Sequence, residues 1–291
     1  MKMLTYGIDV PGILSLVGVQ TDQGQSENIL QIRLRTKCPI LQSMPYSAPP
    51  ITEAVIEIKF SQPLETGKLS KLNASLSKVY RQGQLVKNLL LDFELNEGEV
   101  QPRASRTEMH GFRLEGADPA ELLILWPQSI VLSQLAPYPG WNAFIARFKA
   151  AWRVMRRVGG YREIARVGVR YINRIDIPFE DGKAEYEKHL NIYPRLPKSM
   201  ESVDMYTVQT LSHLPDIGCS LRVNSGRIPS PLINHASFIL DIDIAKEQNL
   251  PMKEGSLFDL LDAVRGEKNR IFEECVSDLA RDRFKPCQQT L

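Results

Sequence analysis

Two segments that lie far apart in this chain alternate between apolar and polar residues, and this alternation constrains the fold more than any other feature. The first covers residues 52–60 and the second residues 164–177. A period of two places successive side chains on opposite faces of a β-strand, so each segment has one apolar face. Strands of this kind are typical of antiparallel sheets that pack one face on a core.

Helical periodicity marks three further segments, at residues 65–80, at 140–158 and near the C-terminus. In the last of these, Ser256 takes the N-cap position and Asp259 comes three residues later, as in a capping box. Strand-like runs lie between the helices, at 85–95, 109–115, 122–126, 130–135, 205–211, 218–223 and 237–244, with a short helical piece at 183–190.

The order of these elements is similar in the two halves of the chain, about 45–160 and 161–291. Each half has a strand, a helix, three or four strands and then a longer helix, although no residue-level repeat links them. This order predicts a single α+β domain over 45–291, in which curved antiparallel sheet packs on long helices. It also suggests internal duplication of a β-α-β(3-4)-α unit, as in a saddle of the TATA-binding-protein type.

Residues 1–44 alternate only weakly, unlike the strand at 52–60, and they end at a proline-rich junction, residues 45–50. Two interpretations are open. Met44 is the true start and the preceding residues are a mis-called or flexible extension, or these residues form a short extra strand or hairpin.

Composition is that of an ordinary globular protein, with 43% hydrophobic and 24% charged residues among 291. No apolar run approaches the roughly 20 residues that span a bilayer, and no convincing signal peptide is present. The four cysteines are scattered without a CxxC pair, which favours a reducing compartment. We therefore expect a cytoplasmic protein that does not associate with membranes.

The net charge of +2 hides a strong local asymmetry. Between positions 147 and 174 stand nine basic residues and a single acid, Glu163, so this segment carries +8 and the rest of the chain −6. Local charge of this kind bears on binding partners and not on the fold. The basic residues are Arg147, Lys149, Arg153, Arg156, Arg157, Arg162, Arg166, Arg170 and Arg174.

The polar face of the second alternating strand carries Arg166, Gly168, Arg170 and Arg174. Its arginines are four residues apart, which separates their Cα atoms by about 13 Å. Arginine offers a planar fork that fits phosphate or carboxylate, and Gly168 leaves backbone uncovered where a ligand could approach. These four residues are the candidate anion-binding site, which the helix arginines Arg153, Arg156 and Arg157 could extend.

A structural interpretation of the same strand is an ion-pair ladder. If residues 164–177 pair with residues 52–60, Glu53 and Glu57 face Arg170 or Arg174 and neutralise them, and Asp176 does the same within the strand. For the helix arginines, a solvated charged face is the corresponding interpretation.

Paired acids leave an enzymatic alternative open. Asp241 and Asp243 share a strand face about 7 Å apart, and Glu53 and Glu57 share another, so acids and arginines together suit chemistry on a phosphorylated or nucleotide-like substrate. However, the sequence has no phosphate-binding glycine loop, no GxSxG and no HExxH, and its four histidines are widely separated. We expect no metal and no cofactor.

Four segments carry a resemblance to a known family. They are PPITEAVIEI at 49–58, PYPGWNAF at 137–144, RVGVRYINRI at 166–175 and KNRIFEE at 268–274. Together they resemble a sporadically distributed family of prokaryotic proteins of uncharacterised function, over about Pro45 to Phe284. Residues 1–44 lie outside the match, which favours Met44 as the start. The resemblance implies no known activity, substrate or cofactor, and it suggests an accessory or defence-type gene context.

The function that these observations favour is that of a non-enzymatic binding or regulatory protein. Its partner would be an anionic ligand, a nucleic acid or another protein, held by the arginine-rich strand. Nucleic-acid binding lacks exposed aromatic residues in support, because Trp141, Phe148 and Trp152 fall at the helical spacing of a core.

Overall fold

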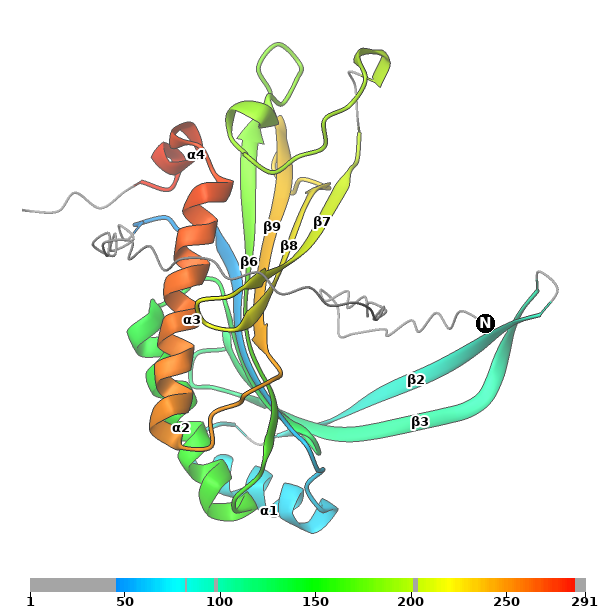
Figure 1. Ribbon diagram of the computed structural model, residues 1–291, viewed down its shortest axis with the longest axis vertical. Coiled ribbons are helices and arrows are strands. Elements are labelled where there is room, and N and C mark those ends of the chain that lie inside the picture. Colours follow the sequence, from blue (N-terminus) through cyan, green and yellow to red (C-terminus); the bar gives the residue numbers. More distant parts are fainter. Residues whose placement is uncertain (1–45, 82, 97–98, 201–203, 286–291) are drawn as a thin grey trace, which may run out of the picture. The chain divides into compact units, whose positions relative to one another are not determined.

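The computed structural model of the protein describes residues 46–81, 83–96, 99–200 and 204–285 (Figure 1). The chain forms two compact units, and the larger one comprises residues 43–85 and 111–291. The other comprises residues 1–42 and 86–110, of which the hairpin strands at 86–96 and 99–110 are described. The N-terminal extension predicted at 1–44 lies outside the described residues.

The described residues form nine strands, four α-helices and two 3-10 helices. Every strand pairing given by the register is antiparallel, and the sheet order is β2-β3-β4-β5-β1-β6-β9-β8-β7. An α+β fold with an open, curved antiparallel sheet is thereby confirmed. The strands are β1 Ile51–Phe60, β2 Gln84–Asn96, β3 Glu99–Glu115, β4 Glu121–Trp126, β5 Ser129–Leu135, β6 Ile164–Pro178, β7 Thr207–Leu214, β8 Cys219–Ile228 and β9 His235–Lys246. The helices are α1 Thr66–Leu76, α2 Trp141–Gly159, η1 Tyr186–Lys188, η2 Lys198–Met200, α3 Glu254–Cys275 and α4 Asp278–Arg283.

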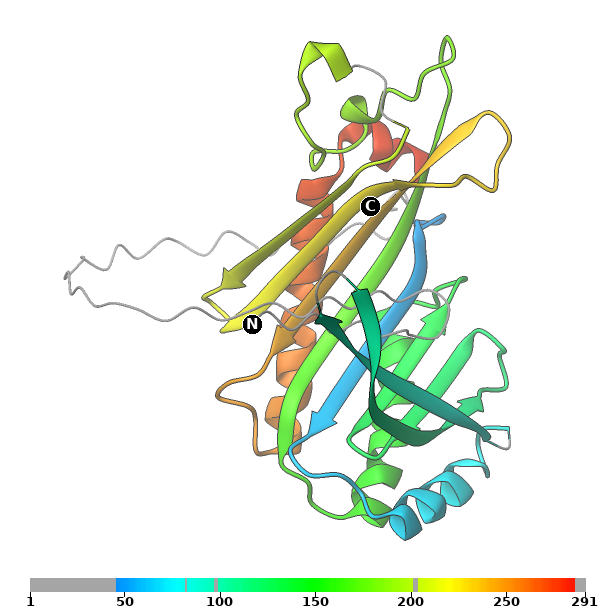
Figure 2. The same cartoon turned by 90° about the vertical axis from the view of Figure 1, so that its right-hand side faces the viewer.

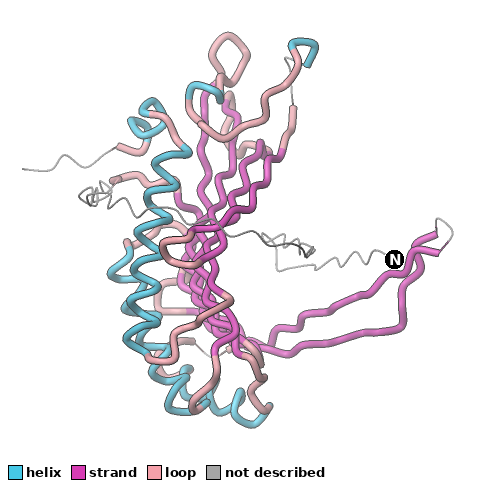
Figure 3. The backbone as a smooth tube through the Cα atoms, in the orientation of Figure 1, coloured by secondary structure: helices cyan, strands magenta, loops and turns pink. Residues whose placement is uncertain are grey.

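Helices α2 and α3 lie on one side of the sheet, as the tube view shows (Figure 3). We call the sheet face toward these helices the covered face, and the opposite face the open face. Alternation places Ile56, Val169 and Ile242 on the covered face, where each is at most 1% exposed. Phe144 of α2 and Leu261 of α3 are fully buried in the same core. The apolar half of each alternating strand therefore makes the core, as its period predicts.

The C-terminal helix differs from its prediction. It begins at Glu254, and Lys253 is an N-cap without a side-chain hydrogen bond, so Ser256 lies inside the first turn. It ends at Cys275 because Val276 turns to an extended conformation and makes a β-bridge with Leu190. A separate helix, α4, comes next in the chain, and the single predicted helix was wrong at both ends.

The two halves share part of their topology. Strands β1 and β6, the first of each half, are neighbours at the centre of the sheet, and the last strand of each half, β5 or β9, pairs with its own first strand. The helix predicted at 183–190 shrinks to the single turn η1, so the second half has no counterpart of α1 among its described residues.

One charged side chain lies inside the core between α3 and β6. Lys268 is 8% exposed, and its Nζ lies 3.9 Å from the centre of the Tyr171 ring. The Tyr171 hydroxyl shares a hydrogen bond of 2.9 Å with the hydroxyl of Tyr138. Burial, together with the charge of Arg265, lowers the pKa of Lys268 to about 7, although the charge of Glu273 acts in the opposite direction.

We predict that the protein becomes more stable as pH rises from about 7 to about 9. In this window the unfolded chain keeps a proton on Lys268 that the folded protein has lost, because the ordinary lysine pKa is 10.5. Replacement Lys268→Met should flatten the dependence and stabilise the protein at pH 6 by on the order of 3 kcal/mol. Urea unfolding across pH 6–9 measures both effects. The exposed Lys71→Met is the control, and an unchanged pH slope in Lys268→Met would contradict the prediction.

Candidate functional site

The candidate residues from the sequence lie together on the open face of the sheet. Strand β6 runs between β1 and β9, so its polar side chains meet those of both neighbours. Figure 2 views the sheet from this side, with α3 behind the strands. The register brings Glu57 opposite Gly168, and Asp243 opposite Arg170. The residues concerned are Arg166, Gly168, Arg170 and Arg174 of β6, Glu53 and Glu57 of β1, and Asp241 and Asp243 of β9.

Arg166 is engaged by three carboxylates from two directions. Its Nη1 donates to Glu57 Oε2 at 2.7 Å, its Nη2 lies 3.3 Å from Asp243 Oδ2, and its Nε lies 3.5 Å from Glu247 Oε1. The side chain is only 19% exposed. Each nitrogen of this guanidinium therefore has an acidic partner, so Arg166 links β1 and β9 across β6.

Gly168 provides the space through which Arg166 reaches Glu57. A Cβ atom at this position would lie 2.3 Å from Arg166 Nη1 and 2.9 Å from its Cζ. The sequence predicts uncovered backbone that an external ligand could approach. In the structure the group that approaches is the guanidinium of Arg166 itself.

Arg170 forms a two-pronged ion pair with Asp241. Its Nε donates to Oδ1 and its Nη2 to Oδ2, both at 2.8 Å, and Asn224 Nδ2 donates to the same Oδ2 at 2.9 Å. The Asp241 side chain is 5% exposed. Burial by itself lowers the pKa of Arg170, but its hydrogen bonds to Asp241 and the charges of Asp241 and Asp243 outweigh burial and raise it. This guanidinium is permanently charged and neutralised.

Glu53 and Glu57 do not form the ion pairs with Arg170 and Arg174 that the ladder interpretation predicts. Glu57 pairs with Arg166 and not with Arg170 or Arg174. Glu53 lies opposite Ile172 and accepts a hydrogen bond from Ser133 Oγ at 2.6 Å. The neutralising acids come from β9 as well as β1, so the ladder runs over three strands.

Arg174 is the arginine of β6 with the most accessible side chain, at 38% exposed. Its Nε lies 3.2 Å from Asp176 Oδ1, which also accepts a hydrogen bond from Ser237 Oγ at 2.5 Å. Among the described residues, the two terminal nitrogens of Arg174 have no hydrogen-bond or ion-pair partner. The residue opposite Arg174 on β9 is Ile239, which cannot supply a charge.

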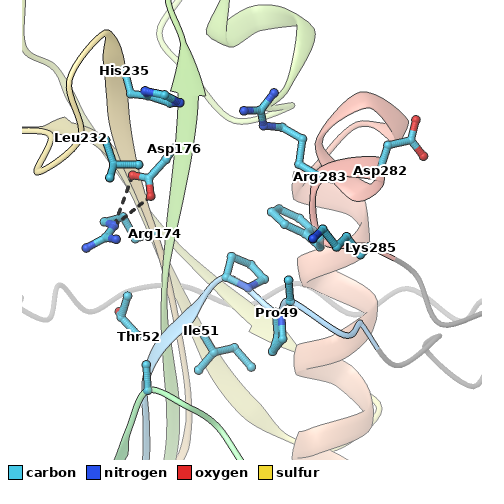
Figure 4. Close-up of a pocket in the computed structure, with 14 residues that line it drawn as sticks. Pro49, Ile51, Thr52, Arg174, Asp176, Leu232, His235, Asp282, Arg283 and Lys285 are labelled. Atoms are coloured by element: carbon cyan, nitrogen blue, oxygen red, sulfur yellow. Dashed lines mark hydrogen bonds and ion pairs between the residues drawn. The ribbon is translucent and has the colours of Figure 1, made fainter.

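Arg174 lines a cleft of about 640 Å³ at the end of β6 (Figure 4). Arg174, Asp176 and His235 stand on one side of it, and Arg283 reaches toward them from α4 on the other. Asp282 points away from this space. The remaining walls come from Ala48, Pro49, Pro50, Ile51, Thr52, Ala136, Leu232, Phe284 and Lys285.

Backbone hydrogen bonds hold the two sides of the cleft together. The amides of Ser47 and Ala48 donate to the carbonyls of Lys285 and Phe284, both at 3.0 Å, and the amide of Arg174 donates to Pro50 O at 2.9 Å. The segment before β1 thus ties the end of α4 to β6. Sequence reasoning missed Arg283 and Lys285, because only this tertiary pairing brings them to the cleft that Arg174 lines.

The arginines of α2 do not extend the strand site. Arg153 and Arg157 are exposed, and Arg156 lies 5.0 Å from the centre of the Tyr161 ring. Helix α2 covers the face of the sheet opposite to the one that carries Arg166 (Figure 1). Arg153 and Arg157 have the exposure of a solvated charged face, whereas Arg156 is half-buried.

A second buried polar cluster was also missed. Arg147 Nη1 donates to Gln134 Oε1 at 2.6 Å and lies 3.2 Å from Glu121 Oε2, while Tyr80 donates to Glu121 Oε1 at 2.7 Å. Gln134 is fully buried. The only signal in the sequence is an acid and an amide on otherwise apolar strand faces.

Within the described part of the chain, no three histidine, cysteine or acidic side chains gather closely enough to hold a metal ion. None of the helices described there is long and apolar enough to cross a bilayer. A comparison with protein-family models and one with curated protein sequences each find no match for the chain. The site must therefore be interpreted from its own geometry.

We predict that Asp241→Asn destabilises the protein by about 3 kcal/mol, because it removes the carboxylate that holds the half-buried Arg170 through two hydrogen bonds. Asp243→Asn is the matched control and should cost about 1 kcal/mol or less, since Arg166 keeps Glu57. Urea unfolding of the two variants measures the difference. A combined Arg170→Met and Asp241→Leu variant should recover most of the lost stability, and equal losses for the two single variants would contradict this assignment.

Proposed function

We propose that the protein is a non-enzymatic binding protein that holds an anionic ligand in the cleft between Arg174 and Arg283. The observation that carries this proposal is the pair of unengaged terminal nitrogens of Arg174, which lines a cleft that Arg283 enters from the other side. Arg283 likewise has no hydrogen-bond or ion-pair partner among the residues that the structure describes.

Charge in the cleft favours an anion. The lining residues include three basic side chains, those of Arg174, Arg283 and Lys285, against two acids. One of the acids, Asp282, points away from the cleft (Figure 4). The other, Asp176, contacts Arg174 through its Nε and leaves the two terminal nitrogens of the guanidinium without an acidic partner among the described residues. A planar guanidinium with free terminal nitrogens donates two parallel hydrogen bonds to a carboxylate or phosphate. The volume of 640 Å³ is within the usual range for small-molecule sites.

The same reasoning separates Arg174 from the other two arginines of the strand. Arg166 and Arg170 each hold buried or half-buried carboxylates, so an incoming anion would have to displace an intramolecular partner. Displacement would leave a carboxylate such as Asp241 buried without a counter-charge, which is costly. The paired acids also weigh against the enzymatic alternative, because acids occupied by arginines are poorly placed to hold a metal or to transfer protons.

We predict that small polyanions raise the melting temperature of the protein and that the effect depends on Arg283. Thermal-shift titrations with inorganic phosphate, pyrophosphate, a nucleoside triphosphate and a dicarboxylate should show saturable stabilisation by at least one probe. Variant Arg283→Gln should weaken the apparent affinity about tenfold or more, since it removes a charge-assisted contact.

The exposed Arg157→Gln of α2 is the matched control and should bind as the unmodified protein does. Binding by the intact protein should also weaken as salt rises, because the contacts are between charges. Stabilisation that is equal in Arg283→Gln and Arg157→Gln would rule out the cleft. Absence of stabilisation by every probe would rule out small polyanions as the ligand class.

We further propose that the sheet arose by internal duplication, with β1 and β6 as equivalent strands. Support comes from the strand order, in which each half continues outward from its own central strand. Aligned sequences of homologues would test this, since equivalent halves should share a profile of apolar positions, and unrelated profiles would reject it.

A further inference from the structure

Among the described residues, strand β7 forms an edge of the sheet. It stands last in the strand order, and the described residues give it one neighbour, β8. Six of its eight residues are exposed, and Leu211 is 69% exposed. The outer side of such a strand presents a row of backbone N–H and C=O groups that can pair with another strand.

The sequence of β7 lacks the features that usually block an edge. Natural edge strands carry lysine or other charges, proline or a bulge, which prevent further pairing. Residues 207–214, TVQTLSHL, contain no lysine, arginine, acid or proline. The pairing of β7 with β8 runs without a register shift from Thr207 to Leu214, so no bulge twists the edge away. By contrast β2, the last strand at the other end of the order, has Lys87, Asp92 and Glu94 in its sequence.

A second copy of β7 fits this edge in one antiparallel register. A two-fold axis perpendicular to the sheet leaves each side chain on its original face, and directly opposite residues of antiparallel strands share a face. One residue must therefore lie opposite its own copy, with the axis between the two copies of that residue. If that residue is Leu211, every pair matches in kind, apolar with apolar and polar with polar. The pairs are Leu211 with Leu211 of the second copy, Thr210 with Ser212, Gln209 with His213 and Val208 with Leu214.

Neighbouring registers lack this match. With the axis between the two copies of Thr210, Leu211 would face Gln209 and Val208 would face Ser212. With the axis between the two copies of Ser212, Leu211 would face His213 and Leu214 would face Thr210. Both arrangements place an apolar side chain opposite a polar one, and cross-strand pairs are the unit of sheet stability. The strand is therefore self-complementary in the Leu211 register.

We propose that the protein forms a homodimer by antiparallel pairing of β7 with β7 of a second copy, centred on Leu211. The two sheets join into one continuous sheet, and the helices of both copies lie on the same side of it. Seven paired residues per copy, 208–214, make a small interface, so the dimer dissociates at low concentration. This inference is independent of the anion-binding cleft, which β7 does not line.

Sedimentation of the full chain over a wide concentration range tests the proposal. We expect the mass to rise from the monomer value of 33.0 kDa toward twice that value as concentration increases. Leu211→Lys places two ammonium groups opposite each other and should raise the dimer dissociation constant at least about tenfold. Val79→Lys, at an apolar residue that is 75% exposed outside the sheet, is the matched control and should associate as the unmodified protein does. A protein that stays monomeric throughout, or a dimer that Leu211→Lys leaves intact, overturns the proposal.

Mixing two charge variants tests the register itself. Leu211→Lys and Leu211→Glu should each be monomeric alone, and an equal mixture should form a heterodimer, because the introduced ammonium and carboxylate groups then face each other across the axis. Recovery of association in the mixture supports pairing through Leu211. Failure of the mixture to associate, where the unmodified protein does, overturns this register. Circular dichroism of both variants confirms that the exposed substitutions leave the fold unchanged.

Discussion

The position of β6 between β1 and β9 is the constraint on which the rest of the larger unit depends. Its covered face supplies Val169 and Tyr171 to the core, and its open face supplies Arg166 and Arg170 to carboxylates on both neighbours. Because side chains alternate, a slip of one residue would move the apolar set out of the core and bury the arginines. The ion pairs and the core therefore specify the same register, and breaking the Arg170 pair removes one of the interactions that define it.

This arrangement explains why a strand so rich in arginine is not uniformly available for binding. The acids of β9 stand at 241 and 243, level with Arg170 and near Arg166, whereas Ile239 stands opposite Arg174. Pairing thus neutralises the middle of the strand, whereas at its end the terminal nitrogens of Arg174 have no partner among the described residues. The same end meets α4 through the segment that precedes β1, so the remaining cations converge there.

Much of this fold is predictable from the sequence, because alternation in β1 and β6 and helical spacing in α2 are strong local signals. The pairing of the two alternating strands, and the presence of acids near their arginines, can also be predicted from the sequence. Which acid pairs with which arginine cannot be predicted in this way. Whether Arg170 meets Glu53 or Asp241 depends on a register with β9, for which the sequence has no local signal. The end of α3 at Cys275 could not be predicted for the same reason, since a bridge between Val276 and the distant Leu190 breaks the helix.

Free polar groups at the borders of the sheet arise from the same physics as the paired groups at its centre. At the centre every strand has two neighbours, so charges and backbone groups find partners within the molecule. At the end of β6, and along the outer side of β7, the sheet supplies a neighbour on one side only. Within the part of the chain that the structure describes, Arg174 keeps unengaged nitrogens for that reason, and β7 keeps unpaired amides and carbonyls. A cation at a strand end favours an anion, while an uncharged edge favours another strand, so the two borders select partners of different chemistry.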